Sequence, residues 1–80
     1  MRSFNLEPIN RLVILGKEQL NRGNFDKALN FFEQAIQLDQ KDPDLWNLKG
    51  ITLRSLGRYD DAISCFNKSL SIDPRDKNAS

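Results

Sequence analysis

The chain repeats itself at a fixed offset, and no insertion or deletion interrupts the register. Gly16 recurs as Gly50, 34 positions later, and Gly23 recurs as Gly57. Further equivalent pairs are Phe25 and Tyr59, Asp26 and Asp60, Ala28 and Ala62, Phe32 and Phe66, and Asp39 and Asp73. A period of this length is typical of stacked repeats, in which one unit cannot bury its apolar face alone. The repeat therefore favours binding by a surface over chemistry in a pocket.

Each copy predicts two helices joined by a glycine turn. Apolar and small residues recur at intervals of three and four, which is the spacing of one helix face. The stripe of the first unit's second helix comprises Phe25, Ala28, Leu29, Phe32, Ala35 and Ile36. Apolar and polar residues alternate nowhere for long enough to indicate a strand. The sequence therefore predicts an all-α protein with four main helices.

Helix ends have their own signals. Gly23 and its equivalent end the first helix of each unit, and Asn24 is expected as the following N-cap. Asp42 is a good N-cap for the third helix, and Pro43 suits its first turn. Pro74 is expected to stop the last helix.

Gly16 and Gly50 lie in the middle of predicted helices, where glycine costs about 1 kcal/mol relative to alanine. The same cost at the same point of both units indicates a close approach of the partner helix. We expect Ala28 opposite Gly16, with the Phe32 ring filling the space beside this contact. The equivalent residues repeat the arrangement in the second unit.

At these residues the chain resembles a pair of tetratricopeptide repeats, whose unit has a W-x2-L-G-x2-Y…A-x3-F…P pattern. The second unit has Trp46, Lys49, Gly50, Leu53, Ala62, Phe66 and Pro74 at these places, and the first has Leu12, Leu15, Gly16, Gln19, Ala28, Phe32 and Gln40. The resemblance implies a short right-handed α-solenoid of two tandem helix-turn-helix units. Its expected divisions are an N-terminal extension 1–8, repeats 9–42 and 43–76, and a tail 77–80.

Two departures from this pattern place polar groups near packing faces. Lys49 stands where the pattern has leucine, and Gln19 stands where it has an aromatic residue. The favoured explanation is structural, with a snorkelling lysine stem and a glutamine at the boundary of the core.

Composition limits the partners and the location. The 80 residues make one domain at most and carry a net charge of +1 with both signs interspersed, which argues against a nucleic-acid footprint. No segment is apolar over the roughly 20 residues that a membrane helix requires. Met1 to Pro8 contain no apolar run of the signal-peptide type. We therefore expect a cytoplasmic protein that binds neither nucleic acid nor membranes.

Catalysis and metal binding find little support in the residue types. The chain has no histidine, and Cys65 is its single cysteine, which favours a structural thiol over a metal ligand. The nearest carboxylate pairs, such as Asp60 with Asp61, stand at helix starts, where acidic residues meet the helix dipole favourably. We expect no cofactor, no metal and no enzymatic activity.

The resemblance also implies a binding surface, because the first helices of tetratricopeptide units line a concave groove. The residues that it places there are Asn10, Val13, Lys17, Leu20 and Asn21 in the first unit, and Asp44, Asn47, Ile51, Arg54 and Ser55 in the second. Their amides can hydrogen-bond an extended backbone, and Lys17 or Arg54 can pair with a carboxylate. The expected function is a protein-interaction module or scaffold that binds a protein or peptide.

The short array leaves an alternative open. Repeat arrays generally need about three units and a polar cap for stability. Five apolar residues near the end of the second unit are expected on an open face: Leu53, Leu56, Ile63, Leu70 and Ile72. The chain could be part of a longer array, a monomer over which Phe4 and Leu6 fold back, or a structural unit that forms a homodimer through this face.

Overall fold

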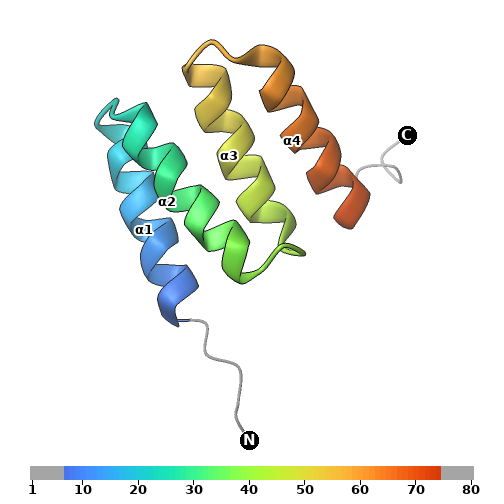
Figure 1. The fold of residues 1–80 in the computed structure, drawn as a ribbon, viewed down its shortest axis with the longest axis horizontal. Helices are drawn as coiled ribbons and strands as arrows, with labels where there is room; N and C mark the ends of the chain where they lie inside the picture. Colours follow the sequence, from blue (N-terminus) through green and yellow to red (C-terminus); the bar gives the residue numbers. More distant parts are fainter. Residues whose placement is uncertain (1–6, 75–80) are drawn as a thin grey trace, which may run out of the picture.

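The computed structural model describes residues 7–74, and these residues form four helices that lie side by side in chain order (Figure 1). Helix α1 spans Glu7–Asn21, α2 Phe25–Leu38, α3 Pro43–Ser55 and α4 Tyr59–Ile72. No strand occurs within the described range, and consecutive helices pack on one another. The all-α prediction of two helix-turn-helix units is confirmed. The expected return of Phe4 and Leu6, and the tail at 77–80, lie outside the described residues.

Glycine turns end α1 and α3 in the same way. Gly23 and Gly57 have positive φ angles of 81° and 82°, which L side chains rarely adopt. The N–H of the residue after each glycine reaches back to a carbonyl of the last turn, from Asn24 to Gln19 at 2.8 Å and from Arg58 to Leu53 at 2.9 Å. These are the bonds of a Schellman motif. The two turns are therefore fixed by local sequence.

The starts of α2 and α3 differ in their capping. Asp42 accepts a hydrogen bond at Oδ1 from the backbone N–H of Asp44, and Pro43 opens α3, as expected. Asn24 precedes α2, but its side chain makes no cap hydrogen bond. Its Nδ2 instead donates to Gln19 Oε1 at 2.8 Å. The N-cap expected for Asn24 is therefore right in position and wrong in mechanism, and Gln19 has a structural role in the turn.

The mid-helix glycines allow an aromatic ring to lie directly on the backbone. A Cβ atom on Gly16 would stand 2.5 Å from Cε1 of Phe32, and one on Gly50 would stand 2.5 Å from Cε1 of Phe66. A close contact at these glycines was predicted from the sequence and is confirmed. The nearest atoms are those of the phenylalanine rings, which were expected beside the contact, and not those of Ala28 or Ala62, because the flat ring fits where no Cβ projects.

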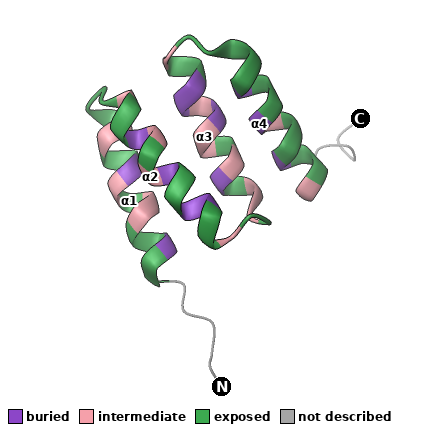
Figure 2. Cartoon of the chain, in the orientation of Figure 1, coloured by how far each residue is buried: buried purple, intermediate pink, exposed green. Residues whose placement is uncertain are grey.

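Buried residues lie on the facing sides of consecutive helices rather than around one centre (Figure 2). One cluster joins α1, α2 and α3 through Ile9, Ala35, Ile36 and Leu45. The other joins α3 and α4 through Leu53, Ala62 and Cys65, with Leu29, Trp46 and Phe66 packed against it. The buried residues are thus divided between two small clusters along the stack, as expected for stacked repeats.

Candidate functional site

The ten residues predicted to line a groove all lie on α1 and α3, and none of them is buried. Val13, Leu20 and Ile51 are half-buried, and the other seven are exposed. We call this set the α1–α3 surface. Its residues are available to a partner.

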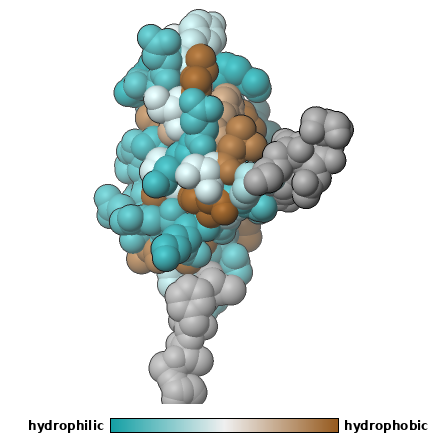
Figure 3. Space-filling view, turned by 90° about the vertical axis from the view of Figure 1, so that its right-hand side faces the viewer, coloured by the Kyte–Doolittle hydropathy of each residue, from teal (hydrophilic) through white to brown (hydrophobic). Residues whose placement is uncertain are grey.

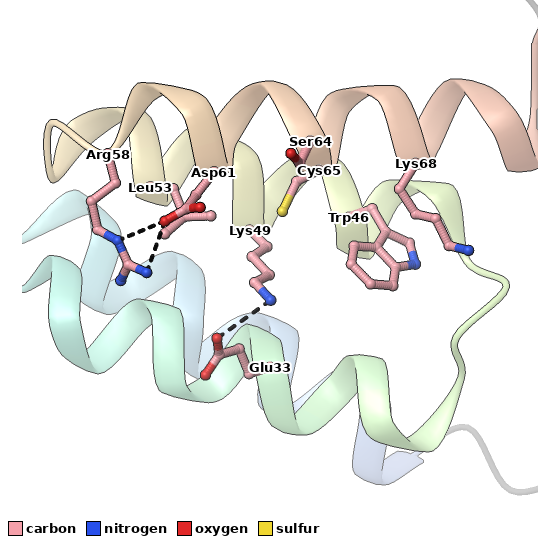
Figure 4. Close-up of a pocket in the computed structure, with 9 residues that line it drawn as sticks. All are labelled: Glu33, Trp46, Lys49, Leu53, Arg58, Asp61, Ser64, Cys65 and Lys68. Atoms are coloured by element: carbon pink, nitrogen blue, oxygen red, sulfur yellow. Dashed lines mark hydrogen bonds and ion pairs between the residues drawn. The ribbon is translucent and has the colours of Figure 1, made fainter.

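A groove of about 400 Å³ opens on a different face of α3 (Figure 4). Helix α3 forms its floor, and α2 and α4 form its walls. The floor residues Trp46, Lys49 and Leu53 are spaced by three and four and share one face of the helix. Asn47 and Ile51 lie roughly 130° and 170° from the middle of this face around the helix axis. This α2–α4 groove is therefore separate from the α1–α3 surface.

Two ion pairs cross or border the α2–α4 groove. Lys49 Nζ lies 3.4 Å from Oε2 of Glu33, which reaches it from α2. At the other end, Arg58 contacts Oδ2 of Asp61 through Nη2 at 2.9 Å and through Nε at 3.1 Å. Lys49 is thus more than a snorkelling stem, because its ammonium group has a defined partner on a neighbouring repeat.

Trp46 is held between two lysines. The Nζ atoms of Lys49 and Lys68 lie 5.6 and 5.8 Å from the centroid of its ring. The indole N–H donates to the carbonyl of Gln40 at 2.9 Å, in the connection before α3. Each cation contributes about 0.5 to 1 kcal/mol at an exposed aromatic face. The ring therefore has a fixed orientation and lies in a cationic environment (Figure 4).

Cys65 lies at the base of the groove and is 5% exposed. Burial raises the pKa of its thiol above the ordinary value of 9.0, and the positive charge of Lys49 opposes part of this rise. The thiol is therefore neutral near pH 7 and packs against Leu53 and Ala62. This environment is that of a structural thiol, as expected from the sequence.

Apolar residues show among hydrophilic ones on the outer face of α4 (Figure 3). Ile63 is 54% exposed and Leu70 is 46% exposed, as expected for an open face. Leu56 and Ile72 are half-buried. Leu53 is only 2% exposed, and its place on the open face was wrongly predicted, because it packs into the core between α3 and α4.

Among residues 7–74, no three side chains of histidine, cysteine, aspartate or glutamate lie together so that they could hold a metal ion. No helix in the same range combines the length and hydropathy needed to cross a membrane.

Known families and proteins agree with this architecture. Tetratricopeptide repeat models match residues 10–42 and 43–76, one for each helix pair. The chain belongs to the tetratricopeptide repeat family. An uncharacterised protein of Methanocaldococcus jannaschii is 41% identical over 58 residues, which are 72% of this chain and 67% of the relative.

Two further relatives are much longer than the chain. The Hsp70-Hsp90 organising protein of Plasmodium falciparum is 38% identical over 69 residues, which are 85% of this chain and 27% of the relative. The peroxisomal targeting signal receptor of Saccharomyces cerevisiae is 30% identical over 62 residues, which are 78% of this chain and 10% of that protein. The chain therefore corresponds to a small part of these tetratricopeptide relatives.

Sequence reasoning did not find the α2–α4 groove as a site. The lysine at position 49 was its one available signal, since the family pattern has leucine there. Glu33, Trp46 and Lys68 come from three helices, and only the packing of those helices brings them together.

Proposed function

We propose that this tetratricopeptide chain is a protein-interaction module that binds a peptide or protein segment along the α1–α3 surface. It has no chemistry of its own in this proposal, and its location is cytoplasmic. The family and its relatives support an interaction module in general. The printed names of two relatives describe a receptor for a targeting signal and an organiser of Hsp70 and Hsp90.

The observation that carries the proposal is the pair of cations on the α1–α3 surface. Lys17 and Arg54 are exposed, and neither makes an ion pair with any other residue between 7 and 74. By contrast, Arg11 and Arg22 on α1 are paired with carboxylates one turn away. Half-buried Leu20 and Ile51 supply apolar contact area on the same surface. The two cations can pair with a carboxylate of a bound peptide segment, and the apolar area beside them can contact apolar side chains of that segment.

The test is the double variant Lys17→Ala with Arg54→Ala, used as bait in native lysate beside the unaltered chain. Partners captured by the unaltered chain should be lost or strongly reduced, while circular dichroism shows the same helix content. The matched control is Lys27→Ala with Lys41→Ala, which removes two other exposed lysines. Capture that is unchanged by the first pair, or equally reduced by both pairs, would contradict the α1–α3 surface as the site.

A second candidate function is structural self-assembly, in which the partner is another copy of the chain. It is favoured by the exposure of Ile63 and Leu70 on the outer face of α4. The molecular mass should then rise from monomer to dimer between micromolar and millimolar concentrations. Ile63→Lys with Leu70→Lys should abolish that rise and keep the helix content. A monomer at both concentrations would exclude this function.

A further inference from the structure

The two lysines beside Trp46 differ in their partners. Lys68 is exposed and makes no ion pair with any residue in the described range. Lys49 is paired with Glu33, but the Glu33 side chain is 47% exposed. The Lys49 side chain is only 23% exposed, whereas the Glu33 carboxylate reaches the surface and can rotate into water. The groove therefore holds one ammonium group without an ion-pair partner in the described range and a second one whose partner can turn away.

The base of the same groove is apolar. Leu53 and Cys65 are both buried, and the side of the Trp46 ring completes this lining. The remaining acidic wall residue, Asp61, is already paired with Arg58. A volume of about 400 Å³ falls at the lower end of the range for ligand sites, about 300 to 1,000 Å³. A ligand that fits this lining needs a carboxylate and a neighbouring apolar group.

We propose that the α2–α4 groove is a second interaction surface, and that its occupant is an acidic peptide segment. A glutamate or aspartate side chain of the segment lies between Lys49 and Lys68 at Trp46 (Figure 4). It displaces Glu33 from Lys49, and an adjacent apolar side chain rests on the half-buried Trp46 ring. This surface is independent of the α1–α3 surface, because the two occupy different faces of α3.

The departure of this chain from the family pattern supports the proposal. Lys49 replaces a leucine of the pattern at the centre of the groove floor. Exchange of a partly buried ion pair for a well-packed apolar side chain is often neutral or stabilising. Lys49→Leu should therefore retain the fold while it removes one of the two cations that receive the ligand.

Trp46 makes the test direct, because it is the only tryptophan of the chain and lies in the groove. The probe is the blocked peptide acetyl-Gly-Leu-Glu-Leu-Glu-Leu-Gly-amide, and the reference is the same peptide with glutamine for glutamate. The glutamate peptide should change the Trp46 emission with saturation. The glutamine peptide should bind about fivefold more weakly, which corresponds to one partly screened ion pair.

Variants of the groove residues should change the affinity for the glutamate peptide in opposite directions, which a purely structural role would not produce. Lys68→Ala and Lys49→Leu should each lower the affinity for the glutamate peptide about fivefold, with the thermal midpoint retained. Glu33→Gln should raise this affinity, because the variant removes the internal competitor for Lys49. Lys27→Ala is the matched control on α2 and should leave the affinity unchanged, because Lys27 is not among the groove residues.

The proposal is overturned by equal affinity for the two peptides, or by an affinity that Lys68→Ala leaves unchanged. It is also overturned if the glutamate peptide leaves Trp46 unaffected up to about 10 mM. Lys17→Ala with Arg54→Ala should not change the Trp46 titration. Because this last variant alters only the α1–α3 surface, it distinguishes binding in the α2–α4 groove from binding at the α1–α3 surface.

Discussion

Helices α2 and α4 hold equivalent positions in the two units, and their apolar residues nevertheless have different surroundings. Helix α2 packs between α1 and α3, whereas α4 packs mainly on α3. Ile36 is 7% exposed and its equivalent Leu70 is 46% exposed. Phe32 is fully buried, and its equivalent Phe66 is half-buried. The same helical stripe is therefore a core in one unit and a surface in the other.

The two ends of the stack differ as well. On α3, Leu45 and Thr52 are buried among the neighbouring helices. The equivalent residues of α1 are the exposed Arg11 and Glu18, each in an ion pair one turn away. A stack of copies with α4 on α1 would bury these charges at a high cost. Self-association, if the second candidate function holds, is therefore expected between two α4 faces.

The largest expected effect compares one substitution at equivalent sites. Ile36→Lys should lower the free energy of unfolding by about 3 to 5 kcal/mol, since it removes a buried side chain and buries an ammonium group. Leu70→Lys should change it by less than about 0.5 kcal/mol, as for an exposed site. Urea unfolding followed by circular dichroism measures both. Equal losses would show that Leu70 belongs to the monomer core.

The mid-helix glycines give the next comparison. Gly16→Ala places a Cβ against Phe32, which is fully buried and has little room to move. It should cost about 1 to 3 kcal/mol, as overpacking does. Gly50→Ala should cost less, because the Phe66 ring is half-buried and can shift outward. Thermal unfolding of the two variants measures both losses of stability. A larger loss for Gly50→Ala would show that the Phe66 ring has less room to move than the Phe32 ring.

A smaller effect concerns a contact that the first unit lacks. The Ser69 hydroxyl donates to the backbone carbonyl of Pro43 at 2.9 Å, whereas the equivalent residue in α2 is Ala35. Ser69→Ala should destabilise the chain by about 1 kcal/mol, the net value of one buried hydrogen bond. Ser71→Ala is the control for helix propensity, since Ser71 is exposed on the same helix. Equal free energies of unfolding for the two variants in urea would show that this hydrogen bond does not stabilise the packing of α4.

The smallest expected effect is the pH dependence from Cys65, which has no cysteine equivalent in the first unit. Because burial raises the pKa of the folded thiol above 9.0, its contribution to stability is fully present below pH 9.0. The contribution is lost as the pH rises through the folded pKa, since the unfolded chain ionises first. The stability advantage of the unaltered chain over Cys65→Ala should therefore decrease as the pH rises above 9.0. A constant difference would contradict the raised pKa.

The sequence by itself determined the elements of the fold. The positions of Gly23 and Gly57 specify helix ends because positive φ is a local property of glycine. Asp42 and Pro43 specify the start of α3 by equally local chemistry. The recurrence of Gly16 and Gly50 at the repeat period predicted a close contact in both units, although Ala28 and Ala62 were expected in it rather than the rings of Phe32 and Phe66. The exposed residues of the α1–α3 surface were also predictable, since they lie off the packing stripe.

Only the tertiary structure decided which apolar and charged residues meet. Leu53 could be assigned to an open face from its spacing, but the position of α4 buries it. The contact between Lys49 and Glu33 depends on the crossing of α2 and α3, and the place of Lys68 at Trp46 depends on the packing of α4. A periodic pattern fixes the direction of a side chain relative to its own helix axis. It does not fix the distance or the angle to the next helix. The α2–α4 groove depends on these distances and angles, and so only the tertiary structure reveals it.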